Sequence, residues 1–294
     1  MKKILTLAAV VTAALSFSAS AQILYKVEKP GNDKVSYVLG THHFAPLSAV
    51  DTIKSLPEII NGIDKLYGEI EMRKMSDPAV IMSMQQKLMA PTDSTLAILL
   101  TPEQTADLTA VWGKYVGSSQ QLAGMLQMVK PAVISTTMAA AMASKALPDL
   151  NPLEGIDGTM QNRAAAAGKI VAGLETMDYQ IDMLYGRPIS EQLESLLKTV
   201  KEADEEGTKA VELSNAYIAH DINKLYELIM DADNDNPQTM ERMIYERNDN
   251  WVNILKDEMN GTSILVVVGA GHLPGERGIL EGLKKAGYTI TAID

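Results

Sequence analysis

Apolar and polar positions near both ends of the chain follow the patterns of β-strands. In residues 35–40 apolar side chains alternate along the run, and Gly40 ends it. Residues 264–268 are a continuous run of isoleucine, leucine and valine, which is typical of a strand buried on both faces. A helix is predicted over 275–286, and with the strand that follows it completes a βαβ-like unit. The predicted strands at the two ends are 35–40, 65–72, 264–268 and 288–293.

Between about residues 76 and 260 the pattern changes to that of helices. Asp77-Pro78 and Thr101-Pro102 each place a capping residue before a proline, which is a signal for the start of a helix. The sequence therefore predicts an α/β (α+β) fold, with a mixed central sheet completed by N- and C-terminal strands and a large helical insertion. The expected elements of this middle part include helices over 156–167, 191–206, 214–220 and 239–260, and a strand over 169–174.

The first 21 residues resemble a secretory signal peptide. Lys2 and Lys3 precede an apolar stretch over residues 4–17, and Ala19-Ser20-Ala21 has the small residues that signal peptidase accepts. A retained membrane anchor is the alternative, although the stretch is shorter than the ~20 residues of a spanning helix. We expect cleavage between Ala21 and Gln22, a periplasmic or secreted protein without a stable membrane anchor, and a single domain over 22–294.

Charge and cysteine content exclude several classes of function. Without Lys2 and Lys3, 24 basic residues face 37 acidic ones, a net charge of −13, so nucleic acid is not an expected partner. The chain has no cysteine, which excludes disulfides, a lipoprotein anchor, thiol nucleophiles and thiolate metal sites. The sequence leaves the oligomeric state open.

Two of the four histidines follow predicted strands in matching contexts. His43 lies in Gly40-Thr41-His42-His43 and His272 in Gly269-Ala270-Gly271-His272. Both are Gly-x-x-His turns at the carboxyl end of a strand, where α/β sheets place their ligand crevices. Either histidine alone could be structural, but the matched contexts favour one shared site.

Acidic residues near the second strand complete a candidate metal site. Glu69 and Glu71 are two positions apart, so on a strand they would share one face. One carboxylate and two imidazoles suffice to hold a divalent cation with open positions for water. Such an ion would lower the pKa of bound water and polarise a carbonyl group. A surface position on an edge strand is the alternative for Glu69.

The chain resembles the TraB/GumN family over most of its mature length. This family is related to the TIKI metalloproteases and has an EreA/ChaN-like fold. The motifs that carry the resemblance are Leu39-Gly40-Thr41-His42-His43, Gly68-Glu69-Ile70-Glu71, Leu174-Glu175-Thr176 with Gln180, Glu246-Arg247-Asn248 with Trp251, and Val268-Gly269-Ala270-Gly271-His272-Leu273-Pro274-Gly275. Glu71 stands where the family usually has Asp.

The resemblance implies metal-dependent hydrolysis of peptide bonds, with a peptide or another small molecule as the expected substrate. His43, Glu69 and His272 would hold a divalent Mn, Co or Zn ion, and His42 would be an outward neighbour. Glu69 or Glu71 would take the proton of the attacking water. Arg247 either binds a substrate carboxylate or stabilises an oxyanion, unless it forms an ordinary salt bridge. Further residues expected around the metal or the substrate are Gly40, Thr41, Glu175, Asn248 and Gly269.

Several features of the sequence leave other interpretations open. A non-catalytic periplasmic protein could use the same crevice to bind haem, a metal ion or a peptide signal. Asp157, at the start of the predicted helix 156–167, is expected to be a helix cap, and His220 is expected to be structural.

Overall fold

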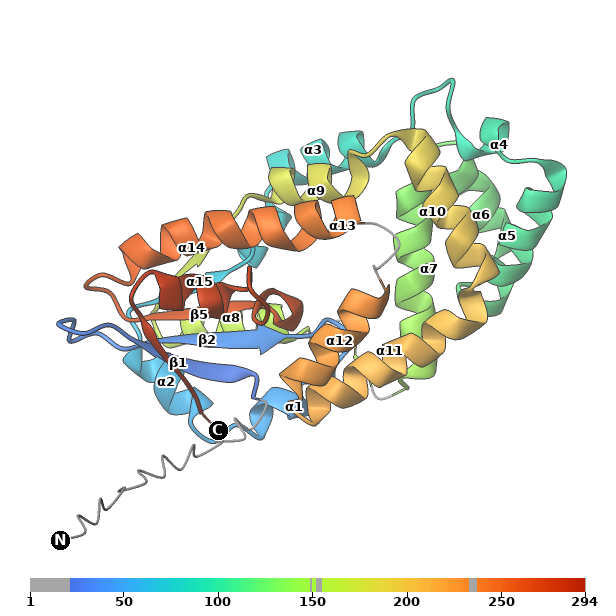
Figure 1. Cartoon of the computed structure of the whole chain (residues 1–294). Coiled ribbons are helices and arrows are strands. Elements are labelled where there is room, and N and C mark those ends of the chain that lie inside the picture. Colours follow the sequence, from blue (N-terminus) through green and yellow to red (C-terminus); the bar gives the residue numbers. More distant parts are fainter. Residues whose placement is uncertain (1–21, 149, 152–154, 233–236, 294) are drawn as a thin grey trace, which may run out of the picture.

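The structure is a computed structural model that describes residues 22–148, 150–151, 155–232 and 237–293 (Figure 1). The predicted signal peptide, residues 1–21, lies outside the described residues. Among the helices that are described, none is both long and apolar enough to cross a membrane.

The described residues form a mixed sheet of six strands, completed by both ends of the chain as the sequence predicted. Its order is β4 (Ile170–Gly173), β3 (Lys65–Gly68), β5 (Ile264–Gly269), β2 (Ser36–Thr41), β1 (Leu24–Glu28) and β6 (Thr289–Ala292). From β4 to β2 the neighbouring strands run parallel, whereas β1 is antiparallel to both β2 and β6. The sheet therefore presents several strand carboxyl ends at one edge.

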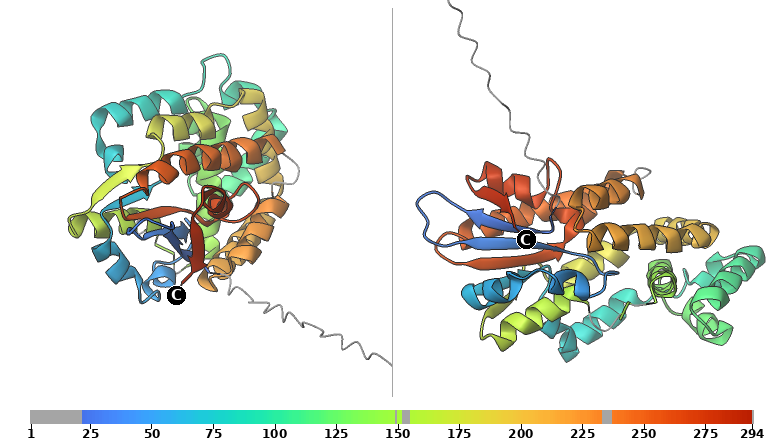
Figure 2. Two further views of the ribbon diagram at one scale, coloured as in Figure 1. Left: turned by 60° about the vertical axis from the view of Figure 1, so that its left-hand side comes forward. Right: turned by 90° about the horizontal axis from the view of Figure 1, so that it is seen from below.

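Helices cover both faces of this sheet (Figures 1 and 2). On one face lie α2 (Leu56–Gly62) and α8 (Ile156–Ala166), and α8 contacts β3, β4 and β5. On the other face α14 (Glu246–Glu258) packs against α15 (Ile279–Lys285). Because both faces are covered, every side chain of β5 from Ile264 to Val268 is fully buried.

The remaining helices lie mainly beyond the strand ends, on the right-hand side of Figure 1. Two of them start as predicted, because Asp77 accepts a hydrogen bond from the Ala79 N–H and Thr101 forms a capping box with Gln104. These elements are α1 (Ser48–Asp51), η1 (Met72–Ser76), α3 (Pro78–Leu88), α4 (Leu96–Leu99), α5 (Pro102–Tyr115), α6 (Ser119–Leu126), α7 (Pro131–Ala146), α9 (Met177–Tyr185), α10 (Ile189–Lys201), α11 (Ala203–Ile218), α12 (Ile222–Ala232), α13 (Pro237–Met240), η2 (Glu241–Tyr245) and η3 (Ala270–His272).

Buried apolar residues fall into two clusters. The larger one surrounds the sheet. The smaller one lies within the helical part and contains Leu96, Leu100, Leu108, Trp112, Leu122, Leu126, Ile134, Met138, Met142, Leu196 and Ala203. The helical insertion therefore has a core of its own, and the single domain proposed for residues 22–294 stays a prediction.

Several predicted elements have different bounds in the structure. The strand predicted over 65–72 ends at Gly68, so Glu69 and Glu71 are not on a strand. The helix predicted over 191–206 is interrupted at Glu202, where α10 ends and α11 begins. The helix predicted from residue 275 begins at Ile279, because Gly275 has a φ of 90°, which no right-handed helix contains.

Candidate functional site

The carboxyl ends of three parallel strands bring the predicted site residues together. Thr41 at the end of β2 pairs with Gly269 at the end of β5, and Gly68 at the end of β3 pairs with Val267. In-register parallel strands end at the same edge, so the turns that follow them are neighbours. This register explains how two histidines more than two hundred positions apart in the sequence reach one site.

Gly40 allows the first turn to lie against the second. A Cβ added at Gly40 would lie 3.0 Å from both the Cα and the Cβ of Ala270. The Gly40 carbonyl also accepts a hydrogen bond of 2.8 Å from the hydroxyl of Tyr217. The glycine is therefore needed for close packing between the two turns, and not for an unusual backbone angle.

Arg247 is the centre of a buried charged cluster. Its Nη2 donates to Glu69 Oε2 at 2.6 Å and to Glu175 Oε1 at 2.8 Å, and its Nε donates to Glu175 Oε2 at 3.1 Å. Its Nη1 donates to the Met243 carbonyl at 2.8 Å and faces His272 Nε2 at 3.1 Å. These contacts occupy all five N–H groups of the guanidinium. In this arrangement Arg247 positions other side chains and has no N–H left for a substrate.

Glu69 is an anion held on both oxygens. Oε1 accepts from the Gly269 N–H at 2.9 Å, and Oε2 accepts from Gln180 Nε2 at 3.1 Å in addition to Arg247. Burial opposes ionisation of Glu69, but His272, Arg247 and the Gly269 N–H outweigh it and lower its pKa to about 2. Glu69 is therefore a carboxylate at any physiological pH.

Glu175 holds the other side of the guanidinium. It accepts from Trp251 Nε1 at 3.2 Å and from Gln180 Nε2 at 3.1 Å, and the Trp251 ring lies 4.5 Å from the Arg247 guanidinium carbon. Burial raises the pKa of Glu175, while its bonds with Arg247 act in the opposite direction. The side chain therefore orients Arg247.

His272 is a neutral imidazole with a fixed tautomer. The guanidinium can only donate, so His272 Nε2 accepts, and the ring proton must be on Nδ1. Nδ1 lies 2.7 Å from Asn248 Oδ1, and Asn248 Nδ2 donates to the carbonyls of His272 and Arg277 at 3.2 and 2.8 Å. Burial lowers the pKa of His272 to about 4. Its Nε2 therefore directs a lone pair into the cluster.

His43 is the accessible member of the site. Its side chain is 72% exposed, and Nδ1 lies 3.3 Å from Asp157 Oδ2. The other oxygen of Asp157 accepts from the Thr41 hydroxyl at 2.8 Å. The hydrogen bond with Asp157 raises the pKa of His43, and the charge of Glu69 adds to this effect. His43 and Asp157 thus form an imidazole–carboxylate pair at the rim of the buried cluster.

His42 and Asp157 differ from their sequence-based interpretations. His42 is not an outward neighbour: its ring lies against Phe44 and Tyr217, and its Nε2 is enclosed without a hydrogen-bond partner. Asp157 lies in the first turn of α8, but its carboxylate contacts Thr41 and His43 instead of capping the helix. The local sequence around Asp157 contains no signal for this role, because both of its partners are in another strand–turn unit.

Glu71 does not face the same way as Glu69. Its carboxylate pairs with Lys74 at 3.0 Å and with Arg73 at 3.6 Å. The chain leaves the extended conformation after Gly68, so the two-residue spacing no longer places the two side chains on one face. The expectation that they share a strand face is wrong.

The three predicted metal ligands do not fit an ion in this arrangement. Among the residues that the structure describes, no three His, Asp or Glu side chains form a group that could hold one. His272 Nε2 and Glu69 Oε1 are 3.9 Å apart, but Arg247 bonds to both side chains and lies between them. His43 is directed to Asp157. An ion could bind here only if the guanidinium moved away.

A comparison with models of known protein families shows which family the chain belongs to. The sequence matches the model of the TraB/PrgY/gumN family over residues 23–292. This chain belongs to the TraB/PrgY/gumN family. The match covers nearly the whole sequence, and it includes every residue of the buried cluster and of the His43–Asp157 pair. Neither the curated proteins nor the solved structures gave a significant match to this TraB/PrgY/gumN member.

Proposed function

We propose that this TraB/PrgY/gumN member is an exported hydrolase that cleaves peptide bonds at the edge of the sheet where β2, β3 and β5 end. The observation that carries the proposal is the pair of histidines with opposite pKa shifts. His43 is exposed and has a raised pKa, whereas His272 is buried and has a pKa lowered to about 4. Two titratable groups whose environments separate their pKa values are suited to act as acid and base.

The proposed roles follow from the protonation state of each side chain. His43, protonated and oriented by Asp157, donates a proton to the leaving amine. His272, neutral with a lone pair on Nε2, accepts a proton from the attacking water once Arg247 Nη1 releases it. Glu69 is too weak a base at a pKa of about 2, so it holds and orients its neighbours. Glu71 is engaged by Lys74 and has no part in this scheme.

A divalent ion remains a separate prediction from the sequence. When bound, such an ion would supply a water of lowered pKa. The scheme above uses only side chains of this chain, because the predicted ligands do not form an ion site here. Elemental analysis of wild type and of a His43→Ala, His272→Ala double variant tests the ion: bound Mn, Co or Zn in wild type that is lost in the variant would support it, and equal content would refute it.

Hydrolysis is tested with the mature chain, residues 22–294, and a library of internally quenched peptides. His43→Ala is expected to lower kcat/KM by about 10²–10⁴-fold, the usual contribution of a general acid. His220→Asn is the matched control, because the His220 ring bonds to the Ala49 carbonyl, outside the proposed site, and its φ of 56° suits asparagine. No cleavage by wild type, or equal cleavage by His43→Ala, would refute the proposal.

Export is part of the proposal and has its own measurement. N-terminal sequencing of the protein from a periplasmic or secreted fraction is expected to begin at Gln22, since Ala19-Ser20-Ala21 offers the cleavage site. A start at Met1 in all cell fractions would contradict export.

A binding protein without turnover is the second candidate. The observation in its favour is the closed state of the cluster, in which the guanidinium and both carboxylates are already satisfied by one another. In that case the exposed His43 would contact haem, a metal ion or a peptide signal. A Soret band in the visible spectrum of the purified protein would favour haem over hydrolysis.

A further inference from the structure

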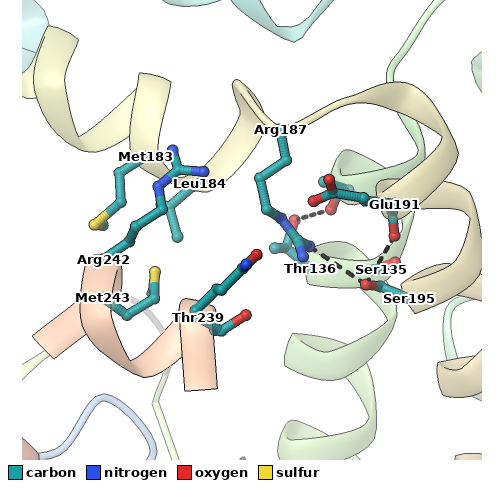
Figure 3. A pocket seen from close by; sticks show the side chains of 12 residues that line it. Ser135, Thr136, Met183, Leu184, Arg187, Glu191, Ser195, Thr239, Arg242 and Met243 are labelled. Atoms are coloured by element: carbon teal, nitrogen blue, oxygen red, sulfur yellow. Dashed lines mark hydrogen bonds between the residues drawn. The ribbon is translucent and has the colours of Figure 1, made fainter. Parts of the chain in front are cut away.

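A cavity in the helical part adjoins the buried cluster. It has a volume of about 220 Å³ and lies between α7, α9, the start of α10, α13 and η2 (Figure 3). Its apolar wall includes Met183, Leu184 and Met243, and its polar wall includes the hydroxyl groups of Ser135 and Ser195. The cavity therefore offers both an apolar surface and hydrogen-bonding groups to one ligand.

Two arginines line this cavity without an anionic partner. Figure 3 shows Arg187 and Arg242 on opposite sides of the space. Arg187 makes one long hydrogen bond of 3.4 Å to Ser195 Oγ, and neither arginine has an ion pair with any residue that the structure describes. The other arginines in the described part of the chain each form an ion pair; for example, Arg163 pairs with Asp51 at 2.7 Å. Two guanidinium groups without carboxylates are a ready site for an anion.

The charge of the cavity matches a single carboxylate. Glu191 also lines it, so two positive groups and one negative group leave a net charge of +1. A dianionic phosphate would leave an excess negative charge beside Glu191, whereas one carboxylate leaves the site neutral. The apolar wall formed by the methionines and Leu184 suits the aliphatic part of an acidic side chain.

Met243 links the cavity to the cluster. Its side chain lines the cavity, and its carbonyl accepts the hydrogen bond from Arg247 Nη1 at 2.8 Å. Arg242 precedes Arg247 by five residues, roughly 7 Å along a helix axis. Arg242 and Met243 lie in η2, a π-helical turn, a form that is frequent at functional sites. A ligand in the cavity would therefore contact the residue whose carbonyl accepts a hydrogen bond from Arg247.

We propose that this cavity binds a carboxylate of a peptide substrate through Arg187 and Arg242, so that the protein selects acidic peptides. Calling the bound peptide a substrate rests on the proposed function, although the binding itself does not require turnover. The carboxylate can come from an acidic side chain or from the chain terminus, which share the same chemistry.

The test is isothermal titration calorimetry with three peptides, carried out in the His43→Ala background so that turnover does not consume them. The probes are N-acetyl-Ala-Glu-Ala-amide, its neutral isostere N-acetyl-Ala-Gln-Ala-amide, and N-acetyl-Ala-Gln-Ala with a free carboxyl terminus. The first against the second measures the side-chain carboxylate, and the third against the second measures the terminal one. We expect at least one carboxylate probe to bind about ten-fold more tightly than the neutral peptide.

Removing a positive charge and removing a negative charge from the cavity should change the affinity for the carboxylate probe in opposite directions. Arg187→Gln and Arg242→Gln should each weaken binding of the carboxylate probe about ten-fold, and Glu191→Gln should tighten it by a few-fold because a like charge is removed. Arg163→Gln, on α8, is the matched control and should leave binding unchanged. All four positions are at least partly exposed, so circular dichroism should show folded variants.

The outcomes separate this inference from the proposed hydrolase. Three results would each overturn the carboxylate site. The charged and neutral probes could bind equally, the His43→Ala protein could bind no probe, or the Arg187→Gln and Arg242→Gln variants could bind the carboxylate probe as tightly as Arg163→Gln does. If the binding results hold but wild type cleaves no peptide, the site stands and hydrolysis fails. If wild type cleaves acidic and neutral peptides equally, hydrolysis stands and the selectivity fails.

Discussion

Replacing Arg247 with methionine tests the charged cluster directly. Methionine keeps much of the length of arginine but carries no charge, so Glu69 and Glu175 would face each other in a buried site. Both carboxylates now contact the same Nη2, at 2.6 and 2.8 Å, so their nearest oxygens are about 5 Å apart. Two negative charges at that separation repel by about 3 kcal/mol at an effective dielectric constant of 20.

The expected loss in the free energy of unfolding is about 3–5 kcal/mol, the usual cost of removing one partner of a buried ion pair. That is a large share of the roughly 5–15 kcal/mol that stabilises a typical protein. Urea unfolding followed by circular dichroism at neutral pH measures the loss. A triple variant, Glu69→Gln, Glu175→Gln, Arg247→Met, removes the repulsion together with the cation and should recover most of it.

In the Arg247→Met variant, the contribution of Glu69 to the pH dependence of stability should be opposite in sign to its contribution in wild type. Without the cation, the two carboxylates raise each other's pKa, so the folded variant binds more protons than the unfolded chain above the unfolded pKa. Its stability should therefore rise as the pH falls through the raised pKa. In wild type the pKa of Glu69 is lowered to about 2, so its contribution is lost as the pH falls below the model-peptide value of 4.5. A loss in the free energy of unfolding below about 1 kcal/mol, or a loss relative to wild type that grows as the pH falls, would refute this account.

Three further predictions concern the turns around the cluster. Gly40→Ala should cost about 1–3 kcal/mol in urea unfolding because its Cβ meets Ala270, whereas Gly113→Ala, with open space in helix α5, should stabilise by about 0.5–1 kcal/mol. Asp157→Asn should lower the pKa of His43, followed by NMR titration of its ring protons, and an unchanged pKa would contradict the pair. Asn248→Ala leaves the His272 ring N–H unpaired and should cost about 1–3 kcal/mol in the same unfolding assay; a smaller change would count against the fixed tautomer.

The parts of the fold that follow local rules could be predicted from the sequence. The β-branched run 264–268 became the central strand β5, and the capping residues Asp77 and Thr101 start helices at the predicted positions. The first strand, β1, was missed, because its residues Leu24–Glu28 are buried three apart and show no alternation. The residue pattern of a single helix or strand predicts its type. It does not identify the other element that packs against it and buries it.

The sequence predicts where the backbone of the candidate site lies, but not which side chains contact one another there. The Gly-x-x-His turns and the strand ends place Glu69 near His272, and the parallel register explains why. The partners of each side chain depend on long-range packing: Asp157 comes from α8, and Arg247 from α14 on the opposite face of the sheet. The five N–H groups of the Arg247 guanidinium then determine which lone pairs of the surrounding side chains remain without a hydrogen bond. The spacing of residues in the sequence does not contain that information.

The charge balance of the cluster adds to the effect of Asp157 in raising the pKa of His43. Glu69, Glu175 and Arg247 with a neutral His272 sum to one negative charge in a site that excludes most water. Taking three ions out of water is costly, and an apolar core of the same shape is often as stable, so stability alone is a weak reason for this arrangement. A buried net negative charge favours a proton on a nearby imidazole, and the pKa of His43 is raised by Glu69 as well as by Asp157. The cluster thereby stabilises a protonated, solvent-accessible imidazole at its rim, which is the group that a substrate would meet first.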